Sequence, residues 1–211
     1  MKENSERFLN GAALLEEMGQ GAILLDIRQP QQFVSGHLVG SLNITFHPVS
    51  YAQQVGFFVP VSRSLVLVCE SAPERLAATF SLLQAGFNII GYTKLIPGLL
   101  LEVFSQLTIH QLWQQISQGR LQRNMGLLDV RSLAEWNEYH IEGAIHIPYC
   151  DIPRRLQELD RHKELVVVAG THYHSLTVIS FLRQHGFDLL GDVPAGMTGW
   201  ARSGLPIKRG S

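Results

Sequence analysis

The sequence lacks several features that would assign it to a common functional class. Its 17 lysines and arginines are balanced by 18 aspartates and glutamates, so the net charge of −1 provides no basic surface for nucleic acid. The most apolar stretch, residues 95–104, spans only about ten positions and contains Pro97, Gly98 and Glu102, which is too short to cross a bilayer. The opening MKENSERFLN contains no apolar signal core. We therefore expect a soluble, cytoplasmic protein without a nucleic-acid or membrane partner.

What the sequence does contain is one pattern that occurs twice. Residues 25–44 read LDIRQPQQFVSGHLVGSLNI and residues 128–147 read LDVRSLAEWNEYHIEGAIHI, at a constant offset of 103. A second match, at an offset of 100, pairs LVLVC at 65–69 with LVVVA at 165–169. Two copies of about 100 residues explain the length of 211 residues, and each copy is long enough to bury its own core.

The repeat predicts two domains, residues 1–102 and 103–211, with a linker around residues 101–106. The two cysteines, Cys69 and Cys150, occupy unrelated places in the copies. A disulfide framework would recur with the repeat, so we interpret both as reduced thiols and Cys150 as structural.

Each copy predicts strands that alternate with helices. The apolar runs AILLDI and SLVLVC in the first copy, and GLLDV and ELVVVA in the second, lack polar alternation and indicate strands buried on both faces. Helical patterns follow at residues 74–86 and 174–186, and both end at a glycine that suits a helix C-cap. The pattern predicts an α/β fold with a parallel sheet in each copy. Ligands of such sheets bind beyond the carboxyl ends of the strands, here at residues 69–75 and 169–175.

Cys69 is the candidate for covalent chemistry. A thiol at the end of a buried strand, just before a helix, receives partial positive charge from the helix N-terminus, and Arg75 adds an anion contact. Glu70 and Glu74 oppose formation of the thiolate. The alternative interpretation is a buried cysteine that behaves as a small apolar side chain.

The repeated LDxR…GHxxG and LDVR…HIEGAIHIP segments, with GMTGWARSGLP at 196–206, resemble rhodanese domains, which are sulfurtransferases. The resemblance covers nearly the whole chain and implies, in each copy, a central five-stranded parallel sheet flanked by helices. It also implies an active loop of the form C-x-x-G-x-R-S, whose cysteine carries sulfane sulfur as a persulfide stabilised by loop amides. No cofactor is implied. The implied partners are a small sulfur donor and acceptor or a persulfide-bearing protein, and the oligomeric state stays open.

Neither loop of this chain matches that pattern fully. In the first copy, Cys69 falls at the nucleophile position and Glu74 at the position of the arginine, with Arg75 one residue later. The resemblance makes the following residues the candidates for binding the sulfur donor: Glu70, Ser71, Ala72, Pro73, Glu74 and Arg75.

In the second copy, Ala169 stands where the cysteine is expected, so this copy is predicted to be inactive in sulfur transfer. The degenerate loop consists of Ala169, Gly170, Thr171, His172, Tyr173, His174 and Ser175. Two histidines in such a triplet are a weak metal motif, and we expect no metal.

Two further resemblances bear on the first loop. The Cys-x5-Arg spacing resembles the dual-specificity phosphatases that share this fold. Residues 69–86 and 169–186 have equal lengths, so a longer loop would require its helix to begin one residue later. The whole chain is also similar to the C-terminal pair of rhodanese domains in fusions with a metallo-β-lactamase-fold persulfide dioxygenase. In those fusions the first rhodanese unit is usually the non-catalytic one. Whether a separate dioxygenase is a partner of this chain stays open.

Residues shared by both copies are interpreted as structural. Asp26 with Arg28 recurs as Asp129 with Arg131, and an ion pair or loop hydrogen bonds at the strand end are expected. The remaining assignments are turn or cap roles for His37 and His140 and core positions for Met197 and Trp200. Three hypotheses follow: sulfur transfer through a Cys69 persulfide, a catalytically inactive binding or regulatory module, and a phosphatase.

Overall fold

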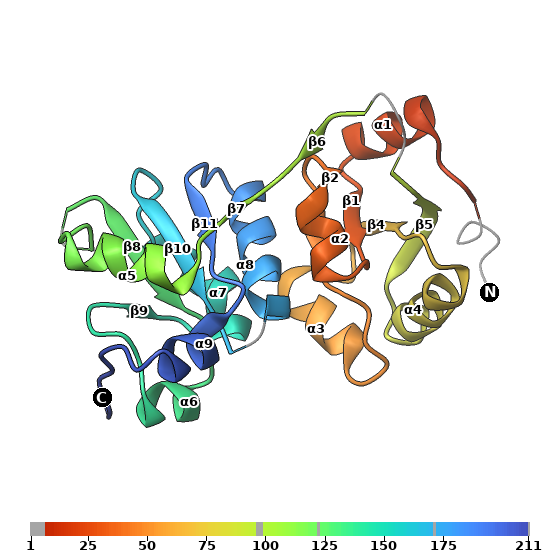
Figure 1. The fold of residues 1–211 in the computed structure, drawn as a ribbon. Coiled ribbons are helices and arrows are strands. Elements are labelled where there is room, and N and C mark those ends of the chain that lie inside the picture. Colours follow the sequence, from red (N-terminus) through yellow and green to blue (C-terminus); the bar gives the residue numbers. More distant parts are fainter. Residues whose placement is uncertain (1–6, 96–98, 122, 171, 211) are drawn as a thin grey trace. The chain divides into compact units, whose positions relative to one another are not determined.

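The computed structural model describes residues 7–95, 99–121, 123–170 and 172–210, and the chain divides into two compact units, Met1–Val103 and Phe104–Ser211. The division falls one residue after the boundary expected from the repeat. Figure 1 shows that each unit contains its own sheet with helices packed around it. Among the described residues, no helix combines the length and apolarity that crossing a membrane requires.

Unit 1 contains a parallel sheet in the order β3-β1-β4-β5 and a small antiparallel pair, β2 with β6. Its elements are α1 (Gly11–Gly19), β1 (Ile23–Asp26), α2 (Pro30–Ser35), β2 (His37–Leu38), β3 (Leu42–Asn43), α3 (Tyr51–Phe58), β4 (Ser64–Val68), α4 (Ala72–Gln84), β5 (Asn88–Thr93) and β6 (Leu101–Glu102).

Unit 2 contains a parallel sheet of five strands in the order β7-β11-β10-β8-β9. Its elements are β7 (Ser105–Gln106), α5 (Ile109–Ser117), β8 (Met125–Asp129), α6 (Leu133–Glu138), β9 (Ile145–His146), η2 (Tyr149–Asp151), α7 (Ile152–Arg155), η3 (Leu156–Glu158), β10 (Glu164–Val168), α8 (His172–Gln184), β11 (Leu190–Asp192) and α9 (Gly196–Arg202).

The five strands expected in each copy are therefore found in unit 2, whereas the described sheet of unit 1 has four. The outer position beside β5 is held in unit 1 by a single parallel bridge between Phe8 and Tyr92. The bridge stays short because helix α1 begins at Gly11, only three residues later. Gly91 permits this approach, since a Cβ there would lie 2.7 Å from the carbonyl oxygen of Arg7.

The central strands are buried on both faces, as the unbroken apolar runs predict. In β4 and β10, four of the five residues are buried. In unit 2, Val166 and Val168 of β10 face a cluster that includes Leu112 of α5 and Met197 and Trp200 of α9. Because successive side chains of a strand point to opposite faces, Leu165 and Val167 pack on the other side. The core positions predicted for Met197 and Trp200 are confirmed.

The helices that follow the central strands end as the sequence predicts. Gly86 and Gly186 both have positive φ values, of 88° and 81°. In each case the N–H groups of the glycine and of the following residue donate to carbonyl oxygens of the last helical turn. The N–H groups of Phe87 and Phe187, for example, donate to the carbonyl oxygens of Leu82 and Leu182. A glycine suits this left-handed position because it has no Cβ.

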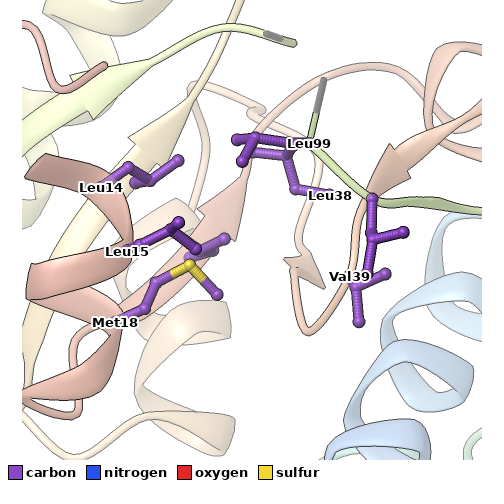
Figure 2. A pocket seen from close by; sticks show the side chains of 8 residues that line it. Leu14, Leu15, Met18, Leu38, Val39 and Leu99 are labelled. Atoms are coloured by element: carbon purple, nitrogen blue, oxygen red, sulfur yellow. The ribbon is translucent and has the colours of Figure 1, made fainter. Parts of the chain in front are cut away.

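Unit 1 also contains an apolar cavity of about 330 Å³, shown in Figure 2. Leu14, Leu15 and Met18 of α1 form one wall, and Leu38 and Val39 lie across from them. Leu14 and Leu38 belong to the unit 1 core. Every lining side chain is aliphatic or a thioether, so this cavity offers no group for sulfur or phosphate chemistry.

Candidate functional site

The two candidate loops occupy equivalent places in the two units. Cys69 follows the carboxyl end of β4, Ala169 follows that of β10, and both are 2% exposed. The next helix begins three residues later in each unit, at Ala72 and at His172. Helix α4 therefore includes most of the segment between Cys69 and Arg75, and the wider loop expected for a Cys-x5-Arg phosphatase is not formed.

The sulfur of Cys69 lies close to strand β5. Its Sγ is 4.0 Å from the carbonyl oxygen of Thr93 and donates to it, and the Cys69 N–H donates to the same oxygen at 3.1 Å. A carbonyl oxygen accepts a proton from a thiol but repels a thiolate. Burial raises the pKa of Cys69 from its ordinary 9.0 to about 11, and the positive charges of Arg75 and Lys94 offset this only in part. At pH 7 the thiolate is then roughly one molecule in ten thousand.

The backbone from residue 72 onward belongs to helix α4. Ser71 caps the helix, and its Oγ accepts the N–H of Glu74 at 3.3 Å. The N–H of Arg75 donates to the carbonyl oxygen of Ser71 at 3.0 Å, and Pro73 has no N–H. Positions 73 to 75 therefore contribute no free amide to an anion on the sulfur.

Arg75 is buried against strand β5. Its guanidinium carbon lies 4.1 Å from the ring centroid of Tyr92, which is a cation–π contact, and the residue is 8% exposed. Of the other candidates, Glu70, Ala72 and Pro73 are exposed at the surface. The positive charge of Arg75 thus acts to lower the pKa of Cys69, while the planar face of its guanidinium contacts Tyr92.

The corresponding edge of unit 2 contains an acid–histidine pair. Nε2 of His172 lies 2.6 Å from Oδ2 of Asp192, and the Gln106 side chain donates to the same oxygen at 3.2 Å. Asp192 is fully buried. It pairs in register with Val167, as Tyr92 does with Leu67. Tyr92 of β5 and Asp192 of β11 thus hold equivalent positions, and each contacts the beginning of the helix that follows Cys69 or Ala169.

The remaining residues of the second loop are structural in character. His174 packs against the Tyr149 ring at 4.4 Å, and burial lowers the pKa of His174. Ser175 is buried and donates to the carbonyl oxygen of His172. Tyr173 is 49% exposed.

Two other members of the second loop complete the comparison. Gly170 lies so close to α6 that a Cβ there would be 3.0 Å from Oε1 of Glu135, and Thr171 lies outside the described residues. In the part of the chain that the structure describes, no three histidine, cysteine, aspartate or glutamate side chains gather to hold a metal ion.

The repeated Asp–Arg pairs are buried ion pairs that fix the turn after the first central strand. Nη2 of Arg28 lies 2.6 Å from Oδ2 of Asp26, and Nη2 of Arg131 lies 2.7 Å from Oδ2 of Asp129. Each arginine also donates to a backbone carbonyl eight residues later. The structural interpretation is confirmed, since the same geometry occurs in the unit without a cysteine.

The repeated histidines close the short helix that follows. His37 stacks on Phe33 at 3.8 Å, and His140 stacks on Trp136 at 3.7 Å. Nδ1 of each histidine is 3.0 Å from the carbonyl oxygen of the same aromatic residue. Both therefore cap a helix end, as expected. The exposed Cys150 and the buried Cys69 are both free thiols.

Five residues of the site were not predicted: Tyr92, Thr93, Lys94, Gln106 and Asp192. Three of them lie on the strands β5 and β11. The sequence contains one signal for them, because the 100-residue offset that aligns Cys69 with Ala169 also aligns Tyr92 with Asp192. An aromatic and an acidic residue share no chemistry, so the alignment alone gives them no common role.

Comparisons with known proteins agree with this architecture. The model of the rhodanese-like domain matches residues 11–95 and again residues 108–203. The thiosulfate sulfurtransferase GlpE of Actinobacillus pleuropneumoniae is 31% identical over 107 residues, which are 51% of this chain and 95% of that protein. The putative sulfurtransferase YtwF of Bacillus subtilis is 36% identical over 74 residues, 35% of this chain and 71% of that protein.

Among solved structures, a rhodanese-related protein from Thermoplasma volcanium is 25% identical, with 50% of this chain and 98% of that chain covered at a TM-score of 0.45. A thiosulfate sulfurtransferase from Pseudomonas aeruginosa is 18% identical and covers 98% of this chain and 41% of its own, also at 0.45. The two family-model matches account for most of the sequence, and the chain belongs to the rhodanese family.

Proposed function

We propose that this chain is a catalytically inactive tandem rhodanese that acts as a binding or regulatory module. The observation that carries the proposal is the position of the Cys69 thiol, which is buried and donates to the carbonyl oxygen of Thr93. Its raised pKa and the engaged backbone of residues 73–75 support the same conclusion. In the second unit, Ala169 has no sulfur with which to form a persulfide.

We propose one of two kinds of partner, which the family relationship suggests. One is a protein that bears a persulfide, and the other is a small molecule that donates or accepts sulfur. We propose a cytoplasmic location, with which two free cysteines are compatible.

A second candidate is sulfur transfer through Cys69, and the position of that residue favours it. Cys69 lies at the carboxyl edge of the sheet before a 13-residue helix. The positive charges of Arg75 and Lys94 also offset part of the rise that burial causes in its pKa. In this reaction the thiolate would attack the outer sulfur of thiosulfate, sulfite would leave, and the persulfide would pass its sulfur to cyanide as thiocyanate.

Steady-state thiocyanate formation from thiosulfate and cyanide distinguishes the two candidates. For an inactive module, the wild-type rate equals that of Cys69→Ser and of Cys150→Ser, and all equal the rate without protein. Turnover that survives Cys150→Ser but is lost in Cys69→Ser establishes sulfur transfer and removes the first candidate. Binding is measured by calorimetry with a peptide that carries a cysteine persulfide, with its reduced form as the control.

A further inference from the structure

Unit 2 contains a second cavity, of about 450 Å³, that none of the residues 169–175 line. We call it the indole pocket. Its principal lining residues are Trp113, Ile116, Ile141, Glu142, Trp200 and Lys208. The volume is within the usual range for small-molecule sites. Its residues 141–143 precede strand β9 and Leu121 precedes β8, whereas Ala169 follows the carboxyl end of β10.

The apolar side of the indole pocket is formed by two tryptophan rings. The rings of Trp113 in α5 and Trp200 in α9 meet edge to face, with centroids 6.0 Å apart and planes at 74°. Trp200 is 1% exposed and Trp113 is half-buried, so the accessible indole surface in the cavity belongs to Trp113, whose ring is supported by Trp200. Such rings offer a preformed surface for an apolar or aromatic group.

The C-terminal segment is tied down as one wall of the pocket. The indole N–H of Trp200 donates to the carbonyl oxygen of Pro206 at 2.9 Å. Two reciprocal backbone hydrogen bonds of 2.8 Å join Lys208 to His140. The indole N–H is thus already satisfied, and the wall keeps its place when the pocket is empty.

Two opposite charges lie together at the mouth. Nζ of Lys208 is 3.9 Å from Oε1 of Glu142, and their side chains are 53% and 84% exposed. An exposed pair at this distance contributes little to stability, so both groups are available for other partners. A ligand with one anionic and one cationic group would satisfy both charges at once.

From this combination we infer that the indole pocket binds a small zwitterion with an apolar or aromatic side chain, the chemical class of free amino acids. The side chain packs on the Trp113 ring, which rests against Trp200, the ligand carboxylate pairs with Lys208, and the ligand ammonium pairs with Glu142. The inference is independent of sulfur chemistry and of Cys69.

The test uses the whole chain labelled with ¹⁵N and L-phenylalanine as the probe, titrated to about 20 mM because exposed ion pairs give weak binding. The three indole N–H signals are assigned with Trp113→Phe and Trp136→Phe. Those of Trp113 and Trp200 are expected to shift in a saturable way, while the backbone signals of unit 1 stay in place. If no indole signal shifts, the inference is overturned.

Charge recognition is tested with matched ligands and variants. We expect 3-phenylpropionate, which lacks the ammonium, and phenethylamine, which lacks the carboxylate, to bind about three- to fivefold more weakly, the size of one exposed ion pair. Glu142→Gln and Lys208→Met should weaken L-phenylalanine by a similar factor, whereas Lys163→Met, at an exposed lysine outside the pocket, should not. Equal affinity for all three ligands, or unchanged affinity in both pocket variants, would contradict the inference.

Discussion

The guanidinium carbon of Arg75 lies 4.1 Å from the ring centroid of Tyr92, and this contact holds against strand β5 the cation that most offsets the raised pKa of Cys69. In unit 2, Asp192 occupies the strand position of Tyr92 and holds His172 at 2.6 Å. In each unit, a residue of β5 or β11 thus contacts the start of the helix that follows the nucleophile position. These contacts support the proposal that neither loop transfers sulfur.

The contact between Arg75 and Tyr92 predicts a difference between two substitutions. Tyr92→Leu removes the aromatic face and should lower the free energy of unfolding by about 1–3 kcal/mol, because the buried Arg75 loses this cation–π contact and packing is lost. Tyr92→Phe keeps the ring and should cost less than about 1 kcal/mol. Urea unfolding measures both, and equal losses in the two variants would show that the ring face is not the stabilising feature.

The raised pKa of Cys69 predicts slow alkylation. In Cys150→Ser, the rate of reaction with iodoacetamide should rise steeply with pH up to about 11. At pH 7 the thiolate fraction is about 100-fold below that of a thiol with the ordinary value of 9.0. The exposed Cys150 in Cys69→Ser serves as the reference, and similar rates for the two thiols at pH 7 would refute the prediction.

The same pKa shift predicts how stability depends on pH. Because the folded state raises the pKa of Cys69, the folded protein holds the proton more tightly than the unfolded chain does. The contribution to stability is present below pH 9 and is lost as the pH rises toward 11, by up to about 3 kcal/mol. Comparing urea unfolding at pH 8 and pH 10.5 with that of Cys69→Ser isolates this loss; a parallel change in both proteins would contradict it.

Breaking a repeated ion pair should be costly because both partners are buried. Arg28→Met leaves the Asp26 carboxylate buried without its partner, and we expect a loss of about 3–5 kcal/mol in thermal or urea unfolding. The double variant Asp26→Leu, Arg28→Met removes both charges and should recover much of that loss. A double variant no more stable than Arg28→Met would argue against this explanation.

In unit 2, His172 should matter for stability through Asp192. His172→Ala removes one hydrogen-bond partner from a fully buried carboxylate, with an expected cost of about 1–3 kcal/mol. His172→Gln provides a matched control, because its amide can still donate to Asp192 and should recover part of the loss. The prediction fails if the alanine and glutamine variants unfold at the same denaturant concentration.

Much of the architecture follows from the sequence because the repeat acts as an internal alignment. The buried strands, the glycine caps and the roles of Asp26 and Arg28 are all readable from residues that the copies share. Strand β5 is not predicted in the first copy. Its sequence NIIGYT contains no unbroken apolar run, because only alternate residues of this strand are buried. Its counterpart in the second copy is reduced to three residues.

The sequence does not predict the protonation state of the Cys69 thiol. Its surroundings are set by Thr93 and Tyr92, which lie more than twenty residues away along the chain and reach Cys69 only through the pairing of β4 with β5. Local sequence predicts a helix N-terminus that favours the thiolate. The structure adds burial and a carbonyl acceptor, which favour the thiol.

The central claim is tested most directly by the intact mass of the Cys150→Ser protein after incubation with thiosulfate under native conditions. We expect an unchanged mass, because the proposed inactive module does not form a persulfide on Cys69. An added mass of about 32 Da, one sulfur atom, that is absent when Cys69→Ser is combined with Cys150→Ser would contradict it.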